Sequence, residues 1–178
     1  KDLEFIDKFV SKGKLTELIR YRDKPFKRLS YTEAVEILNQ NKENVKWGDD
    51  LSTVQEKLLT KIYGPVTVYD YPKDIKSFYM KQNESGETVQ AMDVLMPEIG
   101  ELIGGSMREE NYEKLKENME NKDLNDGSLD WYLNLRKNGT VPHGGFGMGF
   151  ERLIMLVMGL PNIKDCIPYP RYPNHCLL

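Results

Sequence analysis

The chain has 178 residues, about the length of one domain with a sizeable core. Hydrophobic residues make up 39% and charged residues 30% of it, and the net charge of -3 excludes a disordered tail and a basic nucleic-acid module. Cys166 and Cys176, the only cysteines, exclude a disulfide scaffold and a cysteine-rich zinc site. With no run long enough to span a membrane and no signal sequence, a cytoplasmic protein with no membrane partner is expected.

The first part of the chain predicts helices. Apolar residues recur at helical spacing over residues 1 to 20, with a break expected near Gly13. Two capping boxes follow, one beginning at Ser30 and ending at Glu33, the other beginning at Ser52 and ending at Gln55. Each precedes an apolar run, so each predicts the start of a helix.

The middle of the chain predicts strands. Residues 65 to 71, 77 to 81, 88 to 96 and 101 to 106 are short runs rich in β-branched or aromatic residues, and turn residues separate them. This pattern is typical of an antiparallel meander. Residues 107 to 122 and 128 to 138 then predict helices, and residues 150 to 159 predict an apolar, buried helix. The order of elements favours an α+β fold in which an antiparallel sheet is backed by helices.

The most informative motif is the run PHGGFGMGFERLI at residues 142 to 154. Alternate glycines leave one face of a strand without side chains, so a ring or a phosphate can approach the backbone ahead of a helix N-terminus. Arg152, in the first turn of that helix, could stack on a purine or bind a phosphate. The spacing fits neither the Rossmann fingerprint nor a phosphate loop. The alternative is a packing turn with a solvated arginine.

Two carboxylates in the meander are candidates for a metal site. Asp93 and Glu101 lie equidistant from Pro97, so a hairpin turning there would bring them directly opposite each other or nearly so. Facing carboxylates repel unless a cation lies between them, and Mg²⁺ with phosphate oxygens would satisfy them. The alternative is a register shift that separates the two side chains and turns both to water.

Arg108 is the second candidate arginine. It follows the pair Gly104 and Gly105, where missing side chains leave room beside the strand for a small anionic or amide ligand. A guanidinium can grip a carboxylate or an amide oxygen with two donors. The alternative is an ordinary surface arginine, or a helical pair of Arg108 with Tyr112.

Four ordered blocks resemble one family over nearly the whole chain, from about Phe26 onward. The segment GFGMGFER (145–152) resembles motif 3 of class II aminoacyl-tRNA synthetases, and RKNGTVPH (136–143) before it resembles the aspartyl/asparaginyl group. The blocks YPKDIKSFYM (71–80), AMDVLMP (91–97) and ELIGGSMR (101–108) are more similar to asparaginyl- than to aspartyl-tRNA synthetases. IKDCIPYPR (163–171) agrees with them.

The resemblance implies a nucleotide site with ATP as the cofactor. Arg152 would hold ATP as a catalytic residue, and Gly149, Phe150 and Glu151 would line the adenosine. Glu101 would be a second catalytic residue, contacting the phosphates through Mg²⁺.

The same resemblance assigns the remaining residues. Asp93 and Glu101 would carry the Mg²⁺, and Arg108, the third catalytic residue, would bind the amino-acid side chain. The implied reaction joins asparagine to ATP as asparaginyl-adenylate and transfers it to tRNA(Asn). His143 receives no role.

Parts of the family pattern are not found in the sequence. Class II motifs 1 and 2 and the anticodon-binding barrel are missing, so residues 1 to 178 are expected to be the C-terminal part of the catalytic domain of a homodimeric protein, inactive alone. Three alternatives stay open: an aspartyl-tRNA synthetase, a synthetase-derived asparagine synthetase, and a catalytically inactive binding or regulatory paralogue.

Overall fold

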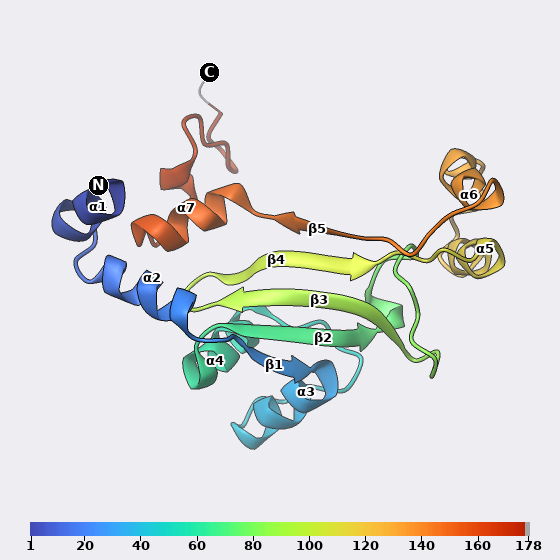
Figure 1. The fold of residues 1–178 in the computed structure, drawn as a ribbon, viewed down its shortest axis with the longest axis horizontal. Helices are drawn as coiled ribbons and strands as arrows, with labels where there is room; N and C mark the ends of the chain where they lie inside the picture. Colours follow the sequence, from blue (N-terminus) through green and yellow to red (C-terminus); the bar gives the residue numbers. More distant parts are fainter. Residues whose placement is uncertain (177–178) are drawn as a thin grey trace.

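The computed structural model describes residues 1–176 and contains one five-stranded sheet in the order β1-β2-β3-β4-β5 (Figure 1). The strands are β1 (Lys27–Ser30), β2 (Val66–Pro72), β3 (Thr88–Met96), β4 (Gly100–Met107) and β5 (Gly144–Met148). Strands β2 to β5 are antiparallel to their neighbours, as predicted, whereas β1 pairs with β2 in parallel. The α+β class is confirmed, and the sheet is mixed because of β1, which was not predicted.

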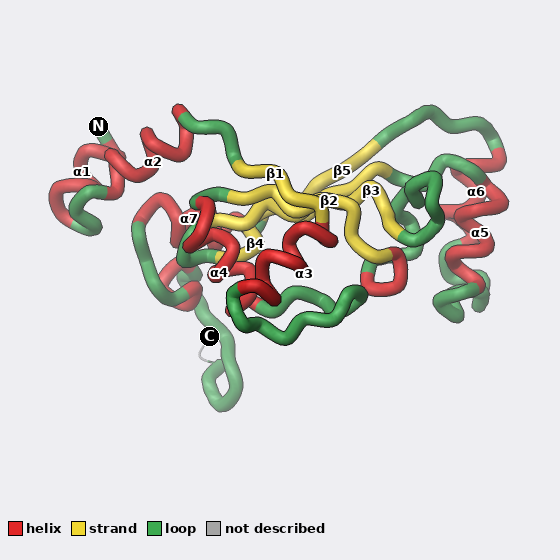
Figure 2. The backbone as a smooth tube through the Cα atoms, turned by 90° about the horizontal axis from the view of Figure 1, so that it is seen from below, coloured by secondary structure: helices red, strands yellow, loops and turns green. Residues whose placement is uncertain are grey.

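Helices lie around this sheet in three groups (Figures 1 and 2). The helices are α1 (Asp2–Phe9), α2 (Lys14–Asp23), α3 (Tyr31–Gln40), α4 (Thr53–Tyr63), α5 (Tyr112–Glu120), α6 (Asp130–Lys137) and α7 (Phe150–Met158), with short 3₁₀ turns at Lys73–Ile75 and Ile163–Cys166. Figure 1 shows α5 and α6 at one end of the sheet and α1, α2 and α7 at the other. Helices α3 and α4 pack on β2 between these ends.

Both predicted capping boxes are confirmed. The Ser30 hydroxyl accepts from the backbone N–H of Glu33, and the Glu33 carboxylate accepts from the N–H of Ser30 in return. Ser52 and Gln55 make the same reciprocal pair at the start of α4. These bonds satisfy N–H groups that a helix N-terminus leaves without intrahelical partners.

The predicted break in the first helix is also confirmed. Helix α1 ends at Phe9, and Gly13 precedes α2 with a φ of 88°, a left-handed conformation that glycine adopts without a steric penalty.

The two faces of the sheet contribute to different cores. Leu95 of β3 belongs to the core shared with α3 and α4, in which Tyr31 and Leu38 are fully buried. Val94, which alternates with Leu95, packs instead in a core with Leu156 of α7. Because successive strand residues point to opposite faces, the helices cover the sheet from both sides.

Three predicted elements differ from the structure. Residues 77 to 81 form no strand; only Met80 pairs there, in an isolated bridge with Arg108. The helix predicted over residues 107 to 122 begins at Tyr112, because the preceding residues complete β4 and this bridge. Helix α7 is apolar but only partly covered, with Leu156 as its one buried residue.

Candidate active site

Two of the three predicted catalytic residues and the predicted metal ligand Asp93 meet at a cavity of about 340 Å³ on the sheet. Asp93, Glu101 and Arg108 all line it, although they come from two strands and the bridge beyond them. The complete lining is Ile75, Lys76, Ser77, Tyr79, Met80, Asp93, Glu101, Gly104, Gly105, Arg108 and Gly147. The cavity therefore brings together the two carboxylates and Arg108, which the sequence singled out.

The two carboxylates share the space above one glycine. A Cβ atom on Gly104 would lie 2.6 Å from Glu101 Oε1 and 3.2 Å from Asp93 Oδ1. The first distance is shorter than any normal van der Waals contact, so a side chain at this position would displace both carboxylates. Gly104 is therefore a requirement of the carboxylate pair.

The predicted register of the β3–β4 hairpin is wrong, although the proximity of the carboxylates is right. Asp93 pairs with Gly104 and Leu95 pairs with Glu101, with a β-bulge between these two pairs. The alternative expectation, that a register shift would turn both carboxylates to water, is wrong as well. The bulge places Glu101 on the same face as Asp93, and both side chains reach the cavity.

Lys76 neutralises Asp93 and is a site residue that sequence reasoning missed. Its Nζ lies 2.7 Å from Asp93 Oδ2 and 3.9 Å from the ring centroid of Tyr71. Burial, and then the charge of Asp93, raises the pKa of Tyr71 well above its usual value, so this ring stays neutral beneath the ion pair. Lys76 lies in a loop, and no local sequence pattern shows which strand residue such a lysine will reach.

Arg108 lies at the far end of the cavity from Glu101. Its guanidinium carbon is 4.3 Å from the ring centroid of Tyr79, and its backbone N–H donates to the carbonyl of His143. A Cβ atom on Gly145 would lie 3.1 Å from Arg108 Nη2, so the absence of a side chain on Gly145 leaves room for the Arg108 guanidinium beside β5. Arg108 precedes α5, which excludes the alternative of a helical pair with Tyr112.

Arg152 lies beside the cavity rather than in its lining. Its Nη1 donates to the backbone carbonyl of Glu101, and its stem folds over Gly149, where a Cβ atom would be 3.3 Å from Arg152 Cδ. Gly149 caps α7 and directly follows β5, so the predicted join of strand and helix is confirmed. Phe150 is 65% exposed and Glu151 is half-buried, and neither lines the cavity.

Glu56 is a third carboxylate at this site, and no sequence pattern indicated it. One of its oxygens accepts from the backbone N–H of Glu101 at 3.2 Å. Burial, and then the charges of Glu101 and Asp93, raises the pKa of Glu56. The peptide of Glu101 is thus bound from one side by α4 and from the other by Arg152 of α7.

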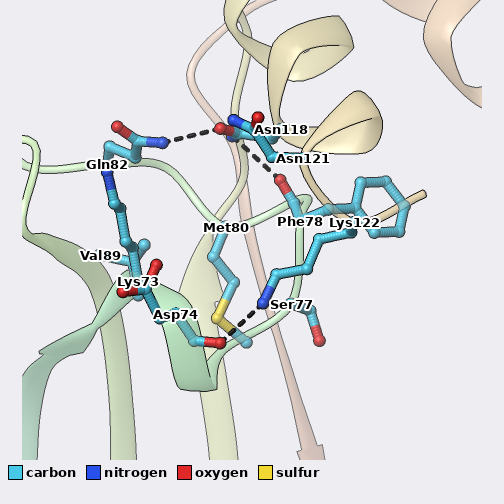
Figure 3. A pocket seen from close by; sticks show the side chains of 10 residues that line it. All are labelled: Lys73, Asp74, Ser77, Phe78, Met80, Gln82, Val89, Asn118, Asn121 and Lys122. Carbon is cyan, nitrogen blue, oxygen red and sulfur yellow. Dashed lines mark hydrogen bonds between the residues drawn. The ribbon is translucent and has the colours of Figure 1, made fainter. Parts of the chain in front are cut away.

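A smaller cavity of about 60 Å³ lies behind the loop that carries Lys76 (Figure 3). Asn118 of α5 accepts from Gln82 at 2.7 Å and donates to the carbonyl of Phe78 at 3.1 Å, and Lys122 donates to the carbonyl of Asp74 at 2.7 Å. These bonds fix the loop against α5. They therefore hold the residues of this loop that line the main cavity.

The carboxylate pair fits a magnesium site completed by phosphate. Within residues 1–176, no group of three or more His, Cys, Asp or Glu side chains could hold a metal ion by itself. Mg²⁺ is commonly bound by one or two carboxylates together with substrate phosphates and water. Asp93 and Glu101, adjacent above Gly104, provide such a pair.

No helix in the described part of the chain has both the length and the apolar character that crossing a bilayer requires.

Comparisons with known proteins identify the family of this chain. The family model of class II tRNA synthetases (D, K and N) matches residues 4–173. A probable mitochondrial asparagine–tRNA ligase of Dictyostelium discoideum is 47% identical over 99% of this chain and 40% of its own length. The chain therefore spans less than half the length of this curated relative.

Solved structures show the same relationship. The asparaginyl-tRNA synthetase of Pyrococcus horikoshii, complexed with asparaginyl-adenylate, has a TM-score of 0.87 and 41% identity over 96% of this chain and 39% of that chain. The aspartyl-tRNA synthetase of Entamoeba histolytica has a TM-score of 0.78 and 30% identity over 85% and 33%, respectively.

The sheet, including the glycine-rich strand before α7, has the fold of a class II synthetase catalytic domain. The chain belongs to the class II tRNA synthetase family of the D, K and N type.

Proposed function

We propose that the full-length protein carrying this chain is an asparagine–tRNA ligase. The observation that carries the proposal is the greater likeness to an asparaginyl- than to an aspartyl-tRNA synthetase, in both identity and TM-score. The cavity adds chemical support, because it combines an arginine for a side-chain amide with two carboxylates for a phosphate-bound cation.

In this proposal the site has a nucleotide end and an amino-acid end. Arg152 holds ATP, and Gly149, Phe150 and Glu151 line the adenosine. Arg108, at the other end of the cavity, binds the amide oxygen of asparagine with its guanidinium. The length of β4 separates the two arginines, which leaves the reacting atoms between them.

Asp93 and Glu101 would hold Mg²⁺, which when bound neutralises phosphate charge and orients the phosphates. Lys76 now neutralises Asp93, and it can offer the same charge to a substrate carboxylate. Glu56 positions Glu101 by accepting its backbone N–H.

The proposed chemistry consists of two transfers. The asparagine carboxylate attacks the α-phosphorus of ATP, forming an O–P bond as the bond to pyrophosphate breaks. A ribose hydroxyl at the 3′ end of tRNA(Asn) then attacks the carbonyl carbon and releases AMP. Positioning and charge neutralisation are the main contributions of the protein, which suits a site of arginines and carboxylates.

We further propose that residues 1–178 form the C-terminal part of a longer catalytic domain, in a homodimeric, cytoplasmic protein. The coverage of about two fifths of the curated relative supports the first point. That relative is named as mitochondrial, so the compartment needs its own test. Fluorescence microscopy of the tagged full-length protein would provide it.

Amino-acid-dependent exchange of pyrophosphate into ATP, measured on the full-length protein, tests the proposed activity. Asparagine should support exchange with a kcat/KM at least about a hundredfold above that of aspartate. Similar values would instead support an aspartyl enzyme of relaxed specificity. Exchange with aspartate and not with asparagine, without transfer to tRNA, would favour an asparagine synthetase, because that enzyme activates aspartate. No exchange with any amino acid would favour an inactive paralogue.

The Mg²⁺ assignment is tested separately. Glu101→Gln removes the charge but keeps the shape of the side chain, so adenylate formation should require a higher Mg²⁺ concentration. An unaltered Mg²⁺ dependence would contradict the metal role of Glu101.

A further inference from the structure

A cluster of aromatic side chains beside the active site has no role in the chemistry above. The aromatic cluster consists of Phe78, Tyr79, Trp131 and Tyr132, and with Leu129 and Arg108 it lines an open cavity of about 450 Å³. The rings of Phe78 and Tyr132 lie 6.0 Å apart, and those of Trp131 and Tyr132 lie 5.6 Å apart, both edge to face. Trp131 is 63% exposed although it is the largest of the four side chains.

The base of the aromatic cluster is fixed. Arg136 is buried, donates to the hydroxyl of Tyr132 at 2.8 Å, and has its guanidinium carbon 4.2 Å from the centroid of that ring. Its Nε also donates to the backbone carbonyl of Glu109, which joins α6 to the end of β4. Trp131 is thus adjacent to Tyr132, whose ring is fixed by Arg136, and its own ring is exposed to solvent.

The aromatic cluster is continuous with the active site. Tyr79 and Arg108 line both cavities, so these two side chains form the wall between them. Only the side chains of Tyr79 and Arg108 would therefore separate a molecule bound on Trp131 from the amino-acid end of the active site.

We propose that the aromatic cluster binds a base of the unpaired 3′ end of tRNA by stacking on Trp131. The inference rests on the proposed function, in which that end must enter the neighbouring cavity to accept the amino acid. Nucleobases have flat π-faces that stack on aromatic side chains without sequence readout, and Arg108 adds a cation at the cavity wall. Asparagine is too small and too polar to fill a space bounded by four aromatic rings.

The test separates the two half-reactions in the full-length protein. In Trp131→Ala, asparagine-dependent pyrophosphate exchange, which needs no tRNA, should stay within about twofold of wild type. The kcat/KM for tRNA(Asn) should fall about tenfold, since stacking contributes roughly 1–3 kcal/mol per base and 1.4 kcal/mol is a factor of ten. Trp131→Phe keeps a stacking face and should recover most of the loss. Leu135→Ala, an exposed residue of the same helix outside the cavity, is the matched control.

A binding measurement keeps the proposal testable without catalysis. Trp131→Ala should weaken binding of a whole tRNA(Asn) transcript but not of the same transcript lacking its unpaired 3′ nucleotides. Equal weakening of both, or no effect on either, would overturn the proposal. A lowered Tm with equal losses in exchange and charging would also overturn it, because the aromatic cluster would then pack against protein. Absence of exchange in the wild type would count against the proposed function alone, since the binding comparison still decides the role of Trp131.

Discussion

The two outer strands of the sheet differ in how they are covered. Strand β1 leads directly into α3, and its Leu29 is buried in the core beneath that helix. Strand β5 has no fully buried residue, and its Phe146 is 71% exposed. Both strands have a single neighbour in the sheet, so the difference lies in the helices that pack on them.

This difference divides the candidate active site. The end with Asp93 and Lys76 rests on a covered part of the sheet and is held by α5 through the loop shown in Figure 3. The end with Arg152 follows the exposed strand β5 and is held by its bond to the carbonyl of Glu101. The side of the site with Asp93 and Lys76 is thus braced within the described chain, whereas Arg152 follows a strand on which no helix packs.

The largest effect should come from comparing the 178-residue chain with the full-length protein. Alone, the chain should form no asparaginyl-adenylate and should self-associate, because β5 presents an unpaired edge and uncovered apolar side chains. Size-exclusion chromatography with light scattering and pyrophosphate exchange measure the two outcomes. A monodisperse monomer with measurable exchange would show that the nucleotide end needs no further cover.

Arg152→Lys in the full-length protein tests the weaker end of the site. Lysine keeps the charge but loses the planar face and the paired donors, so exchange should fall about a hundredfold. The KM for asparagine should change much less, because Arg152 lies outside the cavity lining. The control is Lys164→Arg, which exchanges a lysine for an arginine in the 3₁₀ turn after α7 and should leave the rate of exchange unaltered. If Arg152→Lys behaves like that control, Arg152 has no part in ATP binding.

Gly104→Ala tests the carboxylate pair on the braced side of the site. The added methyl would meet the ends of Glu101 and Asp93, which can rotate aside, so Tm should drop only slightly while exchange falls about tenfold. Gly147→Ala is the control for folding, because a Cβ atom at this position meets no atom within 4 Å and the variant should keep the protein fold intact. Wild-type exchange in Gly104→Ala would contradict the role of the carboxylate pair.

The smallest effect is expected from Asn118→Ala, which removes the brace between α5 and the Lys76 loop. It leaves the amide of Gln82 and the carbonyl of Phe78 without their partner, at a cost of roughly 1–3 kcal/mol in unfolding free energy. Thermal denaturation of the full-length protein should show a lower Tm. Asn121→Ala, also beside the small cavity, provides the control, since its side chain makes neither bond.

Features with a local sequence signal could be predicted. The capping boxes at Ser30 and Ser52 fix helix starts because each bond joins residues three apart. The step from a glycine-rich strand to α7 was equally visible, as was the break near Gly13. The two arginines of the site were found because glycines beside them signal close approach, and the two carboxylates because they lie equidistant from Pro97.

Features that depend on distant partners could not be predicted. Strand β1 is four residues long with Leu29 as its single apolar residue, and its parallel partner β2 begins at Val66, so no local pattern identifies it. The contact of Lys76 with Asp93 and that of Glu56 with Glu101 depend on the path of a loop and the placement of a helix. Tertiary packing decides such contacts.

The bulge in β4 has a consequence for how this strand is compared between proteins. Leu102 and Ile103 both pack in the core with α7, so the alternation of inward and outward residues skips one step there. Strict alternation from Gly104 would assign Glu101 to the α7 side, away from Asp93. The extra residue acts as a frameshift within the strand. Without the bulge, the same sequence would place Leu102 instead of Glu101 on the face of Asp93, which would exchange a carboxylate for a leucine at the active site while the strand from Ile103 onward kept its register.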